Sequence, residues 1–128
     1  MNLKIQNVSL SIKGRLIVND VSITVNPGEV VGLMGPNGAG KTTTFNLAVG
    51  NIKPDKGEVL LNGKKITNLP LPNRSKLGLG YLTQEASIFR DLTVKDNIDL
   101  ALHNSSYTRA AIRNRREQLI NEFNLNDF

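Results

Sequence analysis

Residues 30–50 read VVGLMGPNGAGKTTTFNLAVG, and the rest of the chain is organised around this stretch. Its central part, residues 35–42, matches the P-loop pattern G-x-x-x-x-G-K-[ST]. The apolar run before it, residues 30–34, is typical of a buried parallel strand. Residues 43–49 are typical of a helix, which Gly50 would end. The order of strand, glycine-rich loop and helix predicts a site for the phosphates of a nucleoside triphosphate.

Each residue type in this motif has a physical role in holding phosphate. Glycines permit backbone angles that turn successive N–H groups toward phosphate oxygens, and the following helix directs its positive end at the same anion. Lys41 offers a mobile charge for the β- and γ-phosphates, and the Thr42 hydroxyl is a candidate Mg²⁺ ligand. The residues that we expect to contact the nucleotide are Gly35, Pro36, Asn37, Gly38, Ala39, Gly40, Lys41, Thr42 and Thr43.

The composition is that of a globular protein, with 39% hydrophobic and 21% charged residues among 128. This length favours a single domain. The absence of cysteine excludes disulfides and thiolate metal sites and suits a reducing compartment. The apolar runs lead us to expect neither a membrane span nor a signal peptide. The net charge of +5 permits contact with nucleic acid without requiring it, and we expect no nucleic-acid partner.

Apolar patterns predict a sheet around the P-loop. Two alternating stretches near the N-terminus are separated by a short turn, so an antiparallel pair should precede the parallel strand. Later in the chain, Asn62-Gly63 is a strong signal for a tight hairpin turn. The expected strands are residues 3–12, 16–25, 30–34, 58–61, 64–66 and 79–82. We therefore predict a mixed sheet.

The last third of the chain favours helices. Thr93 and Asp96 have the spacing of a capping box, and the helix that follows them should end at residues 104–106. A last helix should begin at about Thr108. The residues expected on the apolar faces of the two helices are Val94, Ile98, Ala101, Leu102, Ile112, Leu119, Ile120 and Phe123.

Several basic side chains fit a solvated surface better than a binding site. Arg74 and Lys76 follow a proline-rich turn, and we expect both in solvent. The basic group at residues 109–116 has the composition to touch phosphate, but acidic residues follow it on the same helix, which favours a solvated face. Its arginines should lie outside the apolar face. His103 is the only histidine and lies at the expected end of a helix, so we expect it at the surface.

Two motifs together resemble the nucleotide-binding subunits of ABC transporters. They are GPNGAGKTTTF at residues 35–45 and, after a glycine-containing hairpin, GYLTQEASIFRDLTVKDNI at residues 80–98. The resemblance covers essentially all 128 residues in order. Within that family it is strongest to the ATPases that serve lipopolysaccharide export, and its most specific part is QEASIF at residues 84–89. The resemblance implies ATP as the nucleotide, with Mg²⁺.

The resemblance also assigns roles to single residues. Residues 35–42 would be the Walker A loop, and Gln84 would be the catalytic glutamine near Mg²⁺ and the attacking water. A neutral amide can ligate Mg²⁺ through its carbonyl without adding charge. Ile12 is aligned with a position where the family usually carries an aromatic residue that stacks on adenine. We therefore expect Ile12 at the base, with a weaker hold on adenine.

The fold class that follows is α/β, a P-loop NTPase core with a mixed sheet and an antiparallel β-subdomain. We expect residues 1–86 to form part of this core and residues 87–128 the beginning of a helical subdomain. The chain stops at residues 125–128, about where the family's LSGGQ signature would begin. The acidic Walker B strand, its glutamate and the switch histidine would lie beyond, so we expect no ATP turnover by this chain alone.

As a function, the resemblance implies the ATP-binding subunit of a transporter that extracts lipopolysaccharide from the inner membrane by ATP binding and hydrolysis. Its partners would be a second copy of the ATPase and the transmembrane permease subunits, at the cytoplasmic face of that membrane. Three alternatives stay open. They are the ATPase of an importer for branched-chain amino acids or other small solutes, an ABC protein acting on ribosomes or nucleic acid, and a nucleotide-binding fragment without activity.

Overall fold

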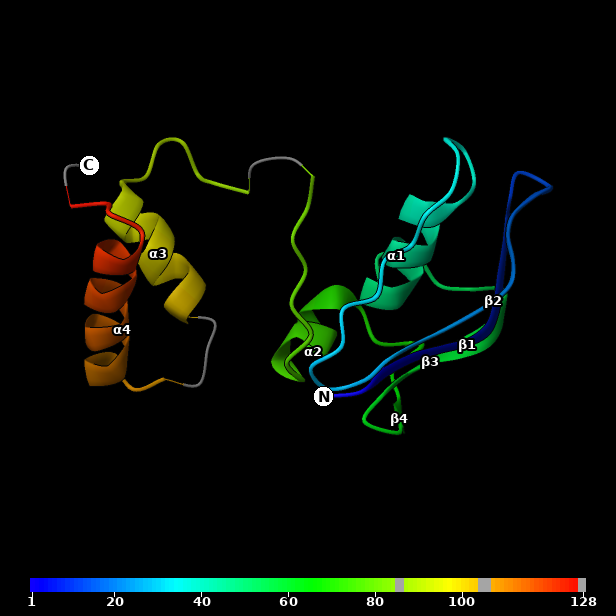
Figure 1. The fold of residues 1–128 in the computed structure, drawn as a ribbon, viewed down its shortest axis with the longest axis horizontal. Coiled ribbons are helices and arrows are strands. Elements are labelled where there is room, and N and C mark those ends of the chain that lie inside the picture. Colours follow the sequence, from blue (N-terminus) through cyan, green and yellow to red (C-terminus); the bar gives the residue numbers. More distant parts are fainter. Residues whose placement is uncertain (85–86, 104–106, 127–128) are drawn as a thin grey trace. The chain divides into compact units, whose positions relative to one another are not determined.

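The computed structural model describes residues 1–84, 87–103 and 107–126. These fall into two compact units, Met1–Tyr81 and Leu82–Phe128, which we describe separately (Figure 1). The elements of the first unit are β1 (Leu3–Ile12), β2 (Arg15–Val25), α1 (Lys41–Val49), β3 (Lys56–Leu61), β4 (Lys64–Lys65) and α2 (Leu71–Lys76). Those of the second are α3 (Val94–His103) and α4 (Arg109–Glu122).

The sheet of the first unit has the strand order β2-β1-β3-β4, and all three pairings are antiparallel. β1 is central, with Leu3 opposite Val25 on one side and opposite Leu61 on the other. The turn at Asn62-Gly63 is confirmed, because both residues have the positive φ angles, 51° and 77°, that a tight hairpin of this type requires.

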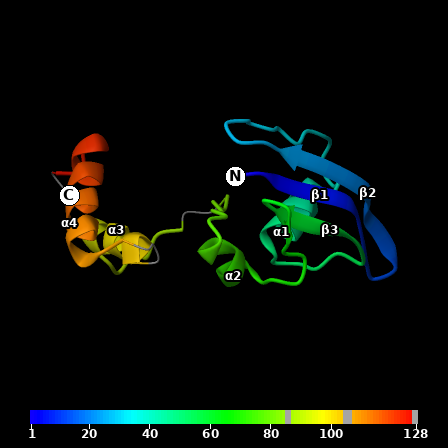
Figure 2. The same cartoon turned by 90° about the horizontal axis from the view of Figure 1, so that it is seen from below.

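One apolar core joins α1 to the sheet. Its buried side chains are Ile5, Val8, Leu10, Val18, Leu47 and Ala48. Leu47 and Ala48 come from the C-terminal half of α1, and the others come from β1 and β2. Figure 2 shows α1 beside the sheet in a second view. A smaller core holds Val59, Leu61 and Ile66, with Leu3, Leu69 and Leu79 packed against it.

Two predicted strands are wrong. Residues 30–34 and 79–82 pair with no other strand, and the described sheet is antiparallel rather than mixed. Val30 is 97% exposed and Leu82 is 88% exposed. A buried parallel strand is held by hydrogen bonds to its neighbours, and no neighbour for either segment lies among the described residues. The α/β class itself is confirmed, with helices packed on a sheet.

In the second unit the predicted capping of α3 is confirmed. The Thr93 hydroxyl accepts from the Asp96 N–H at 3.1 Å and donates to the Asp96 carboxylate at 2.6 Å. Thr108 caps α4 in the same way, by accepting from the Ala111 N–H. Of the predicted apolar faces, Leu102 and Ile112 are buried, while other members are partly or fully exposed. The predicted end of the first helix at residues 104–106 lies outside the described residues.

Candidate functional site

The predicted phosphate loop runs directly into α1, whose N-cap is Gly40. Gly38 and Gly40 have φ angles of 82° and 83°, in the left-handed region that glycine adopts without strain. No side chain caps the helix, and helical geometry leaves its first N–H groups without intrahelical acceptors. Free N–H groups at the positive end of a helix are what an anion binds. The structure thus brings residues 35–43 together at the start of α1.

Lys41 is the first residue of α1, where the loop ends. Its ammonium group donates to the carbonyl oxygens of Gly35 and Pro36, both at 2.7 Å. These two bonds hold a positive charge at the loop rather than in open solvent. A phosphate that approached the N–H groups of α1 would therefore meet a cation already in place.

The threonines after Lys41 divide into two kinds. Thr44 is buried, and its hydroxyl donates to the Gly40 carbonyl at 3.0 Å, so its bonding capacity is used inside the helix. Thr42 is exposed, which suits the proposed Mg²⁺ ligand. Among the described residues no group of three acidic, histidine or cysteine side chains is placed to hold a metal. A Mg²⁺ ion here would be held jointly by Thr42 and phosphate oxygens.

The other two candidate residues have less support from the structure. Ile12 ends β1 opposite Arg15 and is 43% exposed, so its side chain is not part of the core. Gln84 is exposed and belongs to the second unit, whereas the P-loop belongs to the first. The roles of both residues stay predictions. Glu85 and Ala86 of the QEASIF stretch lie outside the described residues.

The expectation that Arg74 is solvated is wrong. Its side chain is 0% exposed and is the largest of the fully buried side chains. The guanidinium donates four hydrogen bonds to backbone carbonyls, and this network removes it from solvent. The acceptors are Leu69 O at 2.7 Å, Leu47 O at 2.9 Å, Ala48 O at 2.6 Å and Thr67 O at 3.0 Å. Burial lowers the pKa of Arg74 from its ordinary value. Lys76 is exposed, as predicted.

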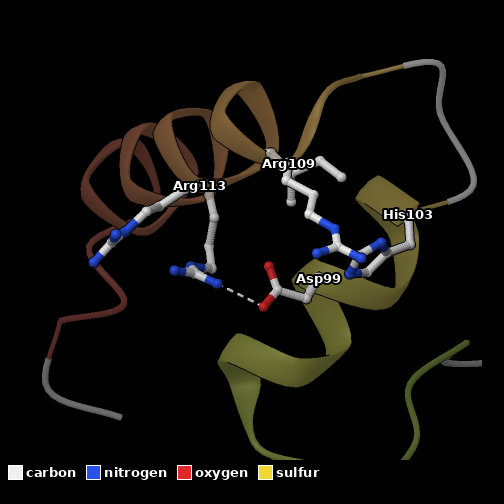
Figure 3. A pocket seen from close by; sticks show the side chains of 6 residues that line it. Asp99, His103, Arg109 and Arg113 are labelled. Carbon is white, nitrogen blue, oxygen red and sulfur yellow. Dashed lines mark hydrogen bonds and ion pairs between the residues drawn. The ribbon is translucent and has the colours of Figure 1, made fainter.

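A cavity of about 310 Å³ lies between α3 and α4 (Figure 3). It is lined by Asp99, His103, Arg109, Ile112, Arg113 and Arg116. The sequence predicts Arg116 outside the apolar face, but its side chain is largely buried and forms an ion pair with Asp99. Its Nη1 lies 2.6 Å from the Asp99 carboxylate, and the two side chains are only 14% and 24% exposed. Asp99 Oδ1 and Arg116 Nε are buried without a partner in the described part of the chain. Arg109, Arg113 and His103 are exposed, as predicted.

Comparison with known proteins agrees with the P-loop geometry. A family model described as "ABC transporter" matches residues 18–128. Proteins named lipopolysaccharide export system ATP-binding protein LptB, from Haemophilus influenzae and Escherichia coli K12, are 49% and 48% identical over 121 residues, which are 94% of this chain and 50% of each relative. A solved structure titled "Structure of ATP binding subunit of ABC transporter" superposes with a TM-score of 0.83 at 27% identity, over 98% of this chain and 51% of that one. The chain spans about half the length of the curated relatives it matches.

Proposed function

This chain belongs to the ABC transporter family, and we propose that it is the nucleotide-binding part of an ATP-binding subunit that drives lipopolysaccharide export. The observation that supports the proposal is the P-loop, where no side chain caps the start of α1 and the Lys41 ammonium is bonded to the Gly35 and Pro36 carbonyls. The choice of lipopolysaccharide rests on the LptB proteins, which are 46–49% identical to the chain over at least 94% of its length.

The chain's residues divide the work of holding Mg-ATP. The first N–H groups of α1 bind phosphate oxygens, and Lys41 exchanges its two carbonyl acceptors for the β- and γ-phosphates. Thr42 ligates Mg²⁺, which neutralises charge on the phosphates. Ile12 contacts the adenine face, and Gln84 orients the attacking water. Hydrolysis is coupled to transport by a second copy of the subunit and by the permease subunits, on the cytoplasmic side of the inner membrane.

The export role can be tested with a chimera. The 121 residues of Escherichia coli LptB that match this chain are replaced by their counterparts from this chain, and the product is expressed in cells depleted of their own LptB. We expect the chimera to restore lipopolysaccharide at the cell surface, and the same chimera with Lys41→Ala to fail. Cell-surface lipopolysaccharide and ATPase activity of the purified transporter are measured in parallel.

A matched chimera gives the control. The same segment is placed in the ATPase of a branched-chain amino-acid importer, whose transport is measured by uptake of labelled leucine. If only the importer chimera works, the lipopolysaccharide assignment is wrong while the ATPase assignment stands. If both chimeras fold but neither hydrolyses ATP, the ATPase assignment is wrong.

A further inference from the structure

The C-terminal end of α1 is held by a buried cation. Arg74, from α2, donates to the carbonyl oxygens of Leu47 and Ala48 in the last turn of α1. The last carbonyls of a helix have no intrahelical donor, and they carry the negative end of the helix dipole. A guanidinium at this end supplies the missing hydrogen bonds and also places a positive charge against the dipole. Figures 1 and 2 both show α2 next to the end of α1 that lies away from the P-loop.

We call the four hydrogen bonds from Arg74 to the carbonyls of Leu47, Ala48, Leu69 and Thr67 the Arg74 clamp. Only an arginine side chain can make all four. The remaining two bonds, from Nε to Leu69 O and from Nη2 to Thr67 O, fix the guanidinium to the segment that leads into α2. One planar group with five donors can reach four carbonyls in different directions, whereas a lysine ammonium is a point with three donors. Among the described residues no carboxylate pairs with Arg74. Its charge is directed entirely at backbone carbonyls, two of them the end of α1.

Gly50 makes room for this clamp. It ends α1 with a φ of 89°, and a Cβ at this position would lie 2.6 Å from Arg74 Nε and 2.6 Å from Leu69 O. A side chain there would displace the guanidinium as well as strain the backbone. The helix end, the glycine and the arginine therefore form one unit.

We propose that Arg74 is a positioning residue for nucleotide binding, because it fixes the direction in which α1 presents the P-loop to phosphate. This inference rests on the proposed function. The nine residues of α1 span about 13 Å, so a tilt of about 10° at the clamped end would move the N-terminal N–H groups by roughly 2 Å. Hydrogen-bond lengths vary by only about 0.5 Å, so such a tilt would move the N–H groups of α1 out of reach of a nucleotide that is also held by Ile12 on β1.

The test compares Mg-ATP affinity with stability. Arg74→Met removes the clamp, whereas Arg74→Lys keeps the positive charge but loses the planar set of guanidinium donors. Val59→Ala is the matched control, because Val59 is 0% exposed and belongs to the smaller core, whose residues include none from α1. Affinities are measured by calorimetry at a temperature where circular dichroism shows each protein folded. We expect a loss of at least tenfold for Arg74→Met, a smaller loss for Arg74→Lys, and a change of less than twofold for Val59→Ala.

Equal affinities in the arginine variants and Val59→Ala would overturn the inference, since Arg74 would then contribute only to stability. If neither arginine variant folds, the inference is tested by NMR on the wild-type chain. The Nε–H signal of Arg74 in a ¹⁵N NMR spectrum should shift and exchange more slowly when Mg-ATP is added. An unchanged signal would overturn the inference.

A Lys41→Ala arm separates this inference from the proposed function. If wild type binds Mg-ATP more tightly than Lys41→Ala does, the P-loop assignment holds, and the arginine variants test the clamp alone. If wild type and Lys41→Ala bind equally, the proposed function fails, and the inference fails with it.

Discussion

A Cβ atom on Gly40 would lie 2.6 Å from the carbonyl oxygen of Ile17 in β2. This approach is too close for any side chain, and the Gly40 φ of 83° also disfavours one. The last glycine of the P-loop is therefore required both for its backbone angle and for the contact of the loop with the sheet. Gly38 has nearly the same φ, 82°, but apart from its chain neighbours no described atom lies within 4 Å of the position that a Cβ would take.

These two glycines form a matched pair for a stability measurement. Gly38→Ala should cost about 1–2 kcal/mol, the strain of a left-handed alanine. Gly40→Ala should cost clearly more, because β2 or the loop must also move. Thermal unfolding followed by circular dichroism gives both values. Equal losses would mean that the loop does not rest on Ile17.

The ion pair between α3 and α4 should contribute to the stability of the second unit. Asp99→Ala leaves the Arg116 guanidinium largely buried without its partner, which should cost about 1–3 kcal/mol. Glu122→Ala is the control, because its 3.9 Å contact with Arg115 is exposed on both sides and should be worth less than about 1 kcal/mol. Urea unfolding monitored by helical signal measures both. Similar costs for the two variants would contradict the prediction.

Ile12→Tyr should tighten Mg-ATP binding, because it adds a flat π-surface at the position that we expect to lie against adenine. The gain should not exceed the about 1–3 kcal/mol that stacking on a base contributes. Ile12 is 43% exposed, so a larger side chain meets no core. Leu16→Tyr, on the neighbouring strand and 52% exposed, is the control and should leave affinity unchanged. An unchanged or lower affinity for Ile12→Tyr would show that Ile12 does not lie at the base.

Phe89 should help to dock the permease subunits. It is 59% exposed, and the Asn97 side chain holds its backbone, accepting from its N–H at 2.9 Å and donating to its carbonyl at 3.0 Å. Ile88 beside it is 63% exposed, and two adjacent exposed apolar side chains with polar neighbours have the composition that we expect of an interface anchor.

In the LptB chimera, Phe89→Ala should release the permease subunits on co-purification without lowering the melting temperature of the isolated ATPase. Phe123→Ala is the control, since Phe123 is 63% exposed at the end of α4. A collapse of the melting temperature in Phe89→Ala alone would place Phe89 in a core instead.

The parts of the fold that the sequence predicts are those set by local chemistry. The Asn62-Gly63 turn, the end of α1 at Gly50 and the capping of α3 by Thr93 each depend on neighbours within a few residues. Local signals of this kind can be identified without knowing the rest of the fold.

The features that the sequence does not predict depend on contacts between distant residues. Residues 30–34 carry a strand pattern, but a strand also needs a partner, and none lies among the described residues. Arg74 lies in a polar stretch of sequence, and it is buried because it contacts the last turn of α1, 26 residues earlier in the chain. Arg116 is drawn in by Asp99 on the preceding helix, 17 residues away.

Calorimetric titration of Mg-ATP into the wild-type chain and into Lys41→Ala tests the central claim most directly. The Gly35 and Pro36 carbonyls that Lys41 contacts lie on exposed residues, so water can replace the ammonium and the loop should keep its fold. A charge-assisted bond contributes about 1.5–3 kcal/mol, so the affinity of Lys41→Ala should fall by roughly 10- to 150-fold. Equal affinity in the two proteins would contradict the assignment of residues 35–42 as the triphosphate site.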